Sequence, residues 1–577
     1  MLIRRPLLIA INLIVLAVLF GYVFYPALSS FINSFHIGSR PLAPFGFVDL
    51  FISGAATLSN YNVVFTSPSG VQSLVNTLLL SVASVITSGV SGVLLAFAFW
   101  RFTFPFKRVL SRLFLLPLGL PPIVGVYSFQ YLYAESGFLP QLLQHALGLS
   151  EPPFSFTGFF AVLLVHTYSF YVHFFLFSYA AFSRVDYSLL EAAENLGAGK
   201  VRTFFKVLLP QISASLYSAA LIVFILSTAS FTAPLIFADR MPFITTEIYN
   251  QKIGGNFGAA NALSVVLVAV SMGLLYLFER WNGRRNPPRS LAGRGAARGV
   301  PSESGIARWM FLVPFALWFL FVMLPVLTLL VVSLADLSPS SISVLPERYT
   351  LGNYIKIFTT ENFYTPFLNS LTMATLSSIP NLIFGAMAGV LLVQRKIYAR
   401  TAISILLLLP LAVPGTALAM NLLSAFTKPS VLTLGVPLAN TYAILPLAYF
   451  IRNIPYITRS VSSVLNIFDY SLTEAASNLG ASGTNVVRRV VLPIILAAVT
   501  SGFLFTFINA LGEFVSSIVL YSAFNRPISV DIFSEQRDFN MGVAAAQGIL
   551  LMLLVFAITS LVSFIFRSQS KLSEFDF

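Results

Sequence analysis

Long apolar runs recur along this sequence and constrain its fold more than any other feature. A helix needs roughly 20 mostly apolar residues to cross the hydrocarbon of a bilayer, because each residue rises only about 1.5 Å. Twelve such runs lie near residues 7–28, 74–99, 109–133, 159–182, 211–236, 260–278, 309–333, 368–393, 402–426, 437–457, 495–521 and 542–566. They are continuously apolar rather than alternating, which predicts membrane helices and not barrel strands.

Composition supports this prediction. Only 10% of the residues are charged and 57% are hydrophobic, whereas soluble domains have about a quarter of their residues charged. Water could not solvate so apolar a surface. We therefore expect an all-α, polytopic membrane protein whose first run is a retained helix and not a cleaved signal.

The basic residues predict the topology. If the N-terminus is cytoplasmic, most Lys and Arg fall in cytoplasmic connections, as the positive-inside rule requires. Examples are Arg101, Lys107, Arg112, Arg184, Lys200, Arg202, Lys206, Arg395, Lys396, Arg400, Arg459, Arg488 and Arg489. Membrane topology thus explains the net charge of +13, and we expect no nucleic-acid partner. We expect a multi-pass plasma-membrane protein, surrounded by lipid, with both termini in the cytoplasm.

The chain consists of two copies of one unit. TLSNYNVVFT at 57–66 matches TLGNYIKIFT at 350–359, an offset of 293 residues. Residues 186–210 match 469–493 at 14 of 25 positions, now at an offset of 283. The ten-residue change falls in the outer loop between the third and fourth helices. We therefore predict two parallel six-helix repeats, related by an axis along the membrane normal.

These observations divide the chain into three parts. The first half is expected at 1–280 and the second at 309–577. The segment 281–308 between them is rich in Gly, Pro, Ser and Arg and is expected to be a basic cytoplasmic linker.

One cytoplasmic loop recurs in both halves, at 186–210 and 469–493. Each copy has Glu-Ala-Ala, three residues, Gly, nine residues, then Val, one residue and Leu-Pro. The residues that define the two copies are Glu191, Ala192, Ala193, Gly197, Pro210, Glu474, Ala475, Ala476, Gly480 and Pro493.

This pattern resembles the EAA loop of the permease subunits of type I ATP-binding-cassette (ABC) importers. Both copies depart from it only in having Val for Ile. The resemblance implies that each loop docks a separate ATPase subunit. A single copy would favour an ordinary amphipathic cytoplasmic helix, but two aligned copies favour docking.

The local sequence suits a short surface helix. Asp186 and Asp469 are expected to cap the helix N-terminus. Gly197 and Gly480 permit the left-handed conformation that ends a helix. Pro210 and Pro493 can each begin the next membrane helix, where a missing N–H is tolerated.

The chain lacks the Gly-x-x-x-x-Gly-Lys-Ser/Thr loop that cradles nucleotide phosphates. We therefore expect no enzyme activity and no cofactor bound by this chain, with Mg-ATP held by the partner. The resemblance implies two copies of a cytoplasmic ATPase and an extracytoplasmic solute-binding protein as partners.

The resemblance places much of the substrate pathway on the fifth helix of each half. The candidate residues are Ser227, Thr228, Ser230, Asn509 and Glu513. An ionised Glu513 within a span should face the bundle interior or water. It could contact a cationic or hydrogen-bonding substrate, or it could be a structural carboxyl bonded to neighbouring helices.

Four other polar residues invite interpretation. Asn76 and Asn369 stand near the start of the second helix of each half; we expect caps, with hydrogen bonds between helices as the alternative. His166 and His173 are seven residues apart, about two helical turns, which is too far to share one metal ion. We expect interior histidines with satisfied hydrogen bonds and no metal site.

The leading hypothesis is the permease subunit of an ATP-driven, binding-protein-dependent importer that works by alternating access. Fused permeases of this kind resemble those for ferric iron and thiamine, with relatives for phosphonates, and ferric iron is the substrate we favour. The alternative is an ion-coupled secondary transporter with two six-helix repeats, which would leave both docking loops unexplained.

Overall fold

A computed structural model describes residues 5–37, 50, 52, 56–284, 305–336, 346, 348–394, 397–469 and 471–566. These residues form helices, with two isolated β-bridges, His36 to Ala56 and Ala335 to Tyr349. The all-α class is therefore confirmed. Most of the expected linker at 281–308 lies outside the described residues, between α16 (Phe257–Arg284) and α17 (Gly305–Ser333).

Fewer uninterrupted spans occur than the twelve that were expected. Within the described residues, eight helices are long and apolar enough to cross a membrane, or ten if two bent pairs are counted. The eight are Pro6–Asn33, Pro68–Arg101, Gly158–Phe182, Lys200–Thr228, Phe257–Leu277, Val313–Ser333, Glu361–Val393 and Met541–Leu561. The two remaining expected spans, 109–133 and 437–457, correspond to helices that fall short of this criterion.

Proline breaks the third helix of each half. In the first half it is divided into α6 (Lys107–Phe114), α7 (Leu116–Gly119) and α8 (Pro122–Tyr133). In the second half, α20 (Arg400–Ala412) and α21 (Gly415–Phe426) meet at 116°. Proline lacks the N–H of the helical ladder and clashes with the preceding turn, so an apolar run of sufficient length becomes a bent pair.

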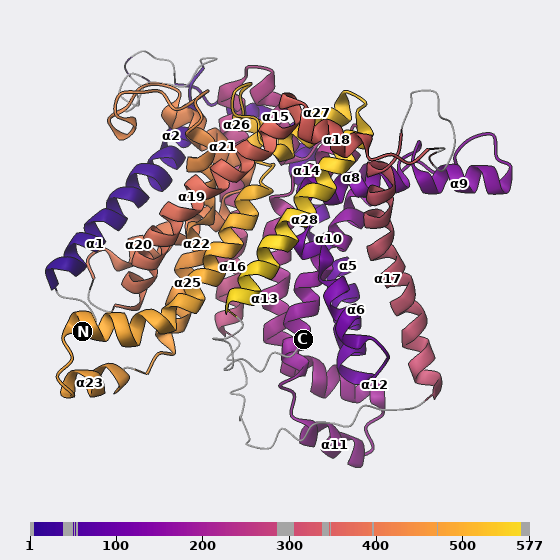
Figure 1. The fold of residues 1–577 in the computed structure, drawn as a ribbon, viewed down its shortest axis with the longest axis horizontal. Coiled ribbons are helices and arrows are strands. Elements are labelled where there is room, and N and C mark those ends of the chain that lie inside the picture. The colour runs from indigo at the N-terminus through magenta and orange to yellow at the C-terminus, as the bar shows by residue number, and fades with distance from the viewer. Residues whose placement is uncertain are drawn as a thin grey trace.

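A three-helix unit forms the centre of each half (Figure 1). In the first half α5 (Pro68–Arg101) packs against α10 (Gly158–Phe182) and α13 (Leu209–Thr228). The corresponding elements of the second half are α19 (Glu361–Val393), α22 (Ile444–Asn466) and α25 (Leu492–Leu511).

Small residues let these helices approach closely. A Cβ on Gly92 of α5 would lie 2.5 Å from the carbonyl oxygen of Tyr171, and one on Gly385 of α19 would lie 2.7 Å from Ile457. Gly92 and Gly385 are repeat equivalents at the 293 offset. Close contact through small residues is a general means of packing membrane helices.

The first helix of each half packs on the other half. Asn12 of α1 (Arg5–Val18) donates to the carbonyl oxygen of Tyr398 at 3.2 Å. The hydroxyl of Tyr22 donates to the carbonyl oxygen of Leu432 at 2.7 Å. In return, Phe315 of α17 lies 4.9 Å from the ring of Phe114 in the first half. These reciprocal contacts hold the two halves together as one bundle.

Asn76 and Asn369 are not helix caps, contrary to expectation. Helix α5 begins eight residues earlier, at Pro68, and Ser67 caps it by accepting from the N–H of Gly70. Asn76 instead donates to the carbonyl oxygen of Pro242 at 2.9 Å, and Asn369 donates to that of Arg526 at 3.0 Å. Both amides thus attach the second helix of a half to the segment that leads into α15 (Ile244–Ile253) or α27 (Ile528–Arg537).

Helix α27, which is not among the spans, is anchored by a buried carboxylate. Asp531 is buried, with Oδ1 2.9 Å from Nη2 of Arg526 and Oδ2 accepting from Gln547 of α28 (Met541–Phe566) at 2.7 Å. Burial raises the pKa of Asp531 to about 6, although the Arg526 guanidinium opposes the shift. The folded protein therefore holds a proton here at a pH where the unfolded chain has lost it.

This raised pKa predicts a pH-dependent stability. Between about pH 4 and pH 6 the folded state binds more protons than the unfolded state, so stability contributed by Asp531 falls as the pH rises. Asp531→Asn does not titrate, so the stability difference between wild type and variant should change by up to about 3 kcal/mol across this window. Thermal unfolding of both proteins in detergent at several pH values measures this change, and a constant difference would contradict the prediction.

Candidate functional site

The two repeated loops fold into matching surface helices, α11 (Tyr187–Asn195) and α23 (Ser471–Asn478). Both lie at one end of the bundle, which we call the docking end (Figure 1). As expected, acidic side chains cap them: Asp186 accepts from the N–H of Ser188 at 3.0 Å, and Asp469 accepts from that of Ser471 at 2.9 Å. The hydrogen bonds from Ser471 lower the pKa of Asp469. The sequence thus sets the start of each helix locally.

A left-handed glycine ends each docking helix, as predicted. Gly197 has φ +80° and Gly480 has φ +84°. In both copies the following alanine reaches back five residues: Ala198 N–H donates to the carbonyl oxygen of Ala193 at 3.0 Å and Ala481 N–H to that of Ala476 at 3.1 Å. This is the bond pattern of a Schellman cap, which requires a residue that tolerates positive φ.

The side chains expected to contact a partner are accessible. Glu191, Ala192, Glu474 and Ala475 are exposed, while Ala193 and Ala476 are half-buried. Within the described part of the chain, neither glutamate forms an ion pair.

Two leucines in these loops were missed by the motif analysis. Leu196 is 88% exposed and Leu479 is 89% exposed, each directly before the left-handed glycine. They occupy the same repeat position, and Leu189 and Leu472 form a second exposed pair. An apolar side chain held in water at matching sites of two loops is typical of a protein-binding surface. The signal was present in the sequence, as leucines retained in both copies of a polar loop.

A continuous helical path leads from each docking loop into the fifth helix. The π-helical turns η2 (Phe204–Leu208) and η4 (Val487–Val491) lie at equivalent positions, between a short α-helical turn and α13 or α25. Pro210 and Pro493 lie in the first turn of α13 and α25, which confirms the expectation that they begin the fifth helices. Each proline follows a π-turn, whose wider bond pattern accommodates the missing N–H.

In the first half, the pathway candidates join a buried hydrogen-bonded cluster. Nδ1 of His166 is 2.9 Å from Oγ of Ser84 and 3.1 Å from Oγ of Ser227, and its Nε2 is 2.8 Å from Oγ of Ser230. Oγ1 of Thr228 is 3.1 Å from Oγ of Ser81. In this conformation these hydroxyls connect α13 to α5 and α10. His166 is thus a satisfied interior histidine, as expected.

His173 differs from that expectation. Its Nδ1 is buried and has no hydrogen-bond partner among the described residues. At the 283 offset its counterpart is Tyr456 of α22.

In the second half, Glu513 is paired rather than free. Its Oε2 is 3.3 Å from Nε of Arg452, and its Oε1 accepts from the N–H of Ser516 at 2.9 Å. Nearby, the hydroxyls of Tyr449 and Ser517 are 2.7 Å apart. The carboxylate thus holds the end of α25 to α22, which is the arrangement of the structural alternative. Asn509, one turn earlier, is half-buried.

The two halves meet at an aromatic cluster beyond the ends of their fifth helices. Phe231 and Phe514 are repeat equivalents at the 283 offset, and their ring centroids are 6.1 Å apart. Each is 1% exposed. Phe231 also packs on Tyr249 at 5.4 Å, and Phe514 on Phe533 at 5.7 Å. We call these four residues the aromatic seal.

The aromatic seal lies at the end of the bundle opposite the docking helices, with α14 (Thr232–Phe237), α15, α26 (Ser517–Leu520) and α27 (Figure 1). Sequence reasoning did not identify it, because a buried phenylalanine has no sequence signal that separates it from other core residues. The repeat offset would have shown only that the two positions correspond, not that they touch.

Comparison with known proteins defines the class to which this arrangement belongs. A family described as the binding-protein-dependent transport system inner membrane component matches residues 88–284 and 381–571. The chain belongs to this family and contains two copies of its domain, each of which includes one docking loop. It is therefore a multi-pass inner-membrane protein and the permease component of an ABC importer, which is not itself an ATPase.

Individual relatives support the same assignment. A probable ABC transporter permease protein, y4fN, of Sinorhizobium fredii is 29% identical over 79% of this chain and 80% of its own length. The ferric transport system permease protein FbpB of Actinobacillus pleuropneumoniae is 24% identical over 94% of this chain and 76% of its own. The molybdenum transport system permease protein ModB of Escherichia coli is 31% identical over its whole length and 40% of this chain. The ion-coupled alternative is not favoured by these matches.

Proposed function

We propose that this chain forms the complete translocation pathway of a binding-protein-dependent importer and couples it to two ATPase subunits. The observation that carries the proposal is the pair of docking helices, which share a cap, a left-handed glycine and an exposed leucine. Each ATPase takes one helix, so a second permease chain is not needed. The docking end is then cytoplasmic, and the solute-binding protein docks at the end with the aromatic seal.

The proposed mechanism is alternating access. ATP binding brings the two ATPase subunits together and moves α11 and α23 with them. A short helical turn follows each docking helix and continues through a π-turn into α13 or α25, so this movement reaches the fifth helices. Their far ends carry Phe231 and Phe514, so the motion separates the aromatic seal and opens the pathway outward. Hydrolysis then restores the closed seal found here.

The substrate is proposed to be a small solute, with ferric iron favoured over thiamine or a phosphonate. Support comes from the similarity to ferric transport permeases, including the Fe(3+)-transport system permease protein FbpB 2 of Haemophilus influenzae, which is 23% identical over 90% of this chain. The match to ModB shows that similar sequences also occur in a molybdenum permease, so the class of solute has to be sought in the pathway itself.

The experiment that tests the proposed function is co-purification. The tagged protein in detergent, taken from its native membranes, should retain an ABC ATPase in a ratio of two to one. Replacing Leu196 and Leu479 together with serine should reduce the retained ATPase at least about tenfold, because burying two leucine side chains is worth roughly 3–6 kcal/mol in total. The double variant Leu189→Ser with Leu472→Ser should reduce ATPase retention less, because these side chains are only half exposed.

Recovery of the chain without an ATPase, together with transport in liposomes driven by an ion gradient, would exclude the importer. Unchanged ATPase retention by the Leu196 and Leu479 double variant would show that the exposed leucines are not the docking surface.

A further inference from the structure

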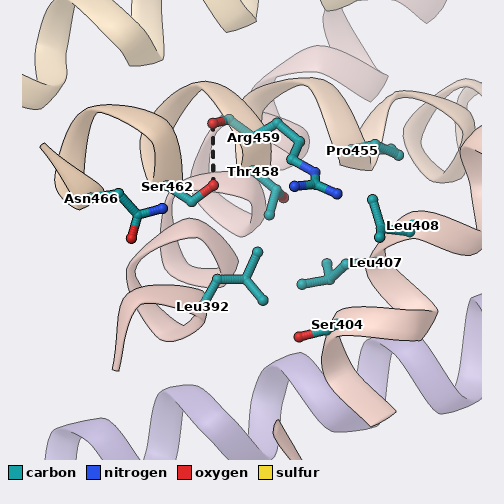
Figure 2. A pocket seen from close by; sticks show the side chains of 9 residues that line it. All are labelled: Leu392, Ser404, Leu407, Leu408, Pro455, Thr458, Arg459, Ser462 and Asn466. Atoms are coloured by element: carbon teal, nitrogen blue, oxygen red, sulfur yellow. Dashed lines mark hydrogen bonds between the residues drawn. The ribbon is translucent and has the colours of Figure 1, made fainter. Parts of the chain in front are cut away.

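Two adjoining cavities in the second half share one cationic side chain. The first, about 190 Å³, lies between α19, α20 and α22, and Figure 2 shows the Arg459 side chain beside Thr458, pointing toward Leu408. The second, about 390 Å³, lies between α20, α22 and α25 and is lined in part by Tyr456, Arg459, Ser460 and Ser501. Arg459 therefore borders both spaces.

Arg459 belongs to a polar face of α22. Arg452, Tyr456 and Arg459 are spaced i, i+4 and i+7, which places them on one side of the helix. The ring of Tyr456 packs edge-on against Phe505 of α25, with centroids 4.6 Å apart. The three residues form a column running from Glu513 toward the docking end.

The upper end of this column lies at the boundary between the two halves. Gly512, next to Glu513, packs so closely on Pro121 of the first half that a Cβ would lie 3.0 Å from it. Phe514, on the other side of Glu513, contacts Phe231. The column thus begins next to the aromatic seal and follows α22 toward the docking end.

The charges of this column do not cancel. Glu513 forms an ion pair with Nε of Arg452. Nη1 of Arg452, however, is buried without a hydrogen-bond partner among the described residues. Arg459 is exposed to the cavity and has no acidic partner in the described chain. Two guanidinium groups and one carboxylate leave a net positive charge, and guanidinium groups bind carboxylate and phosphate oxygens well.

Arg452 and Arg459 have no basic counterparts at the same positions of the first half. At the 283 offset the first half has Ser169, His173 and Leu176 where the second has Arg452, Tyr456 and Arg459. Arg459 was expected to contribute to the membrane topology, and in the first half Arg184, just after α10, supplies a basic residue near the same end. Arg452 lies farther from that end and has no such counterpart, so this asymmetry indicates a function of the second half.

We propose that this column is a solute-binding part of the pathway and that the transported solute presents anionic oxygen atoms to it. The inference rests on the proposed importer function and narrows its substrate. A bare ferric cation would be repelled by the net positive charge, so iron could pass here only within an anionic complex. Arg459 is the specificity-determining residue, and Arg452 is positioned by Glu513 at the upper end.

The absence of cysteine from the chain makes the electrostatic test direct. Ser501→Cys places one thiol in the larger cavity of the full-length protein in phosphatidylcholine nanodiscs. Its reaction rates with an anionic and a cationic methanethiosulfonate reagent are each compared with those of a free thiol. A nearby positive charge should favour the anionic reagent by about five- to tenfold.

Two matched variants supply the controls. Adding Arg459→Gln to the Ser501→Cys variant should remove the preference of the introduced thiol for the anionic reagent. Ser218→Cys, at the repeat equivalent of Ser501, should show no preference, because Leu176 replaces the arginine there. Equal rates for the two reagents in the Ser501→Cys variant, or a preference that survives Arg459→Gln, would overturn the proposal.

Competition identifies the source of the anion. Millimolar inorganic sulfate should slow the reaction of the anionic reagent with the Ser501→Cys variant, as expected for a soluble solute. If sulfate has no effect and phosphatidylglycerol in the nanodisc abolishes the preference instead, the cavity binds lipid headgroups and the solute proposal fails. ATPase co-purification is measured separately, so failure of the importer proposal and failure of anion selectivity are distinguishable.

Discussion

Replacing Gly197 and Gly480 together with valine is expected to abolish coupled uptake while leaving the protein inserted in the membrane. Both glycines have positive φ, near +80°, which a β-branched residue adopts only with strain. Open space surrounds both positions, and a Cβ at either would touch nothing within 4 Å. The expected loss therefore comes from backbone conformation alone.

The strain should misplace the docking surface. Left-handed conformation costs a non-glycine residue roughly 1–2 kcal/mol, and more when it is β-branched, so each loop will rearrange after the helix. We expect solute uptake to fall at least about tenfold for each loop altered, since 1.4 kcal/mol corresponds to a factor of ten. Uptake in cells and ATPase retention after purification measure the two effects.

Gly199 provides the matched control. It lies two residues after Gly197, also has open space around it, and has φ −64°. Gly199→Ala should therefore leave uptake and ATPase retention unchanged. Normal uptake in the Gly197 and Gly480 double variant would remove the main support for the docking proposal.

Loss of the aromatic seal is expected to have the second large effect. Phe231→Ala with Phe514→Ala removes two fully buried rings that meet across the two halves. A buried Phe→Ala substitution typically costs 3–5 kcal/mol, and an aromatic pair adds about 0.5–1.5 kcal/mol. In the proposed mechanism the seal exists only in the closed conformation, so much of this loss should fall on that conformation.

The population should shift toward the outward-open state. A ligand or mutation changes a conformational equilibrium by its differential free energy between the two states. We therefore expect ATP hydrolysis by the assembled complex, measured without solute-binding protein, to rise about tenfold or more. Hydrolysis that still requires the binding protein would contradict the assignment of this cluster as the seal.

Tyr249 and Phe533 allow a graded comparison. Each contacts only one member of the central pair in the described structure. Tyr249→Leu with Phe533→Leu keeps apolar bulk while leaving the Phe231–Phe514 contact intact. This variant should depend on the binding protein as wild type does.

Features that depend on local or periodic interactions could be predicted from the sequence alone. Apolar runs of bilayer length required helices, because backbone polar groups in hydrocarbon must bond within their own segment. The repeated loop required two equivalent units, and its acidic caps and left-handed glycines formed as expected, because capping involves only neighbouring residues. Matched prolines were visible in the third helix of each half, although their consequence, a bent pair instead of a span, was not anticipated.

Tertiary structure decided whatever depends on contacts between distant segments. Asn76 is of a residue type that commonly caps helices. Its hydrogen-bond partner is nevertheless a carbonyl oxygen more than 160 residues away in the sequence. Glu513 stood out as a lone carboxylate, but only packing brings Arg452 within 3.3 Å of it. The meeting of Phe231 with Phe514 is likewise invisible in sequence, because an offset relates equivalent positions without stating their distance. Side-chain partners are chosen by how the helices pack, and that choice is a property of the whole bundle.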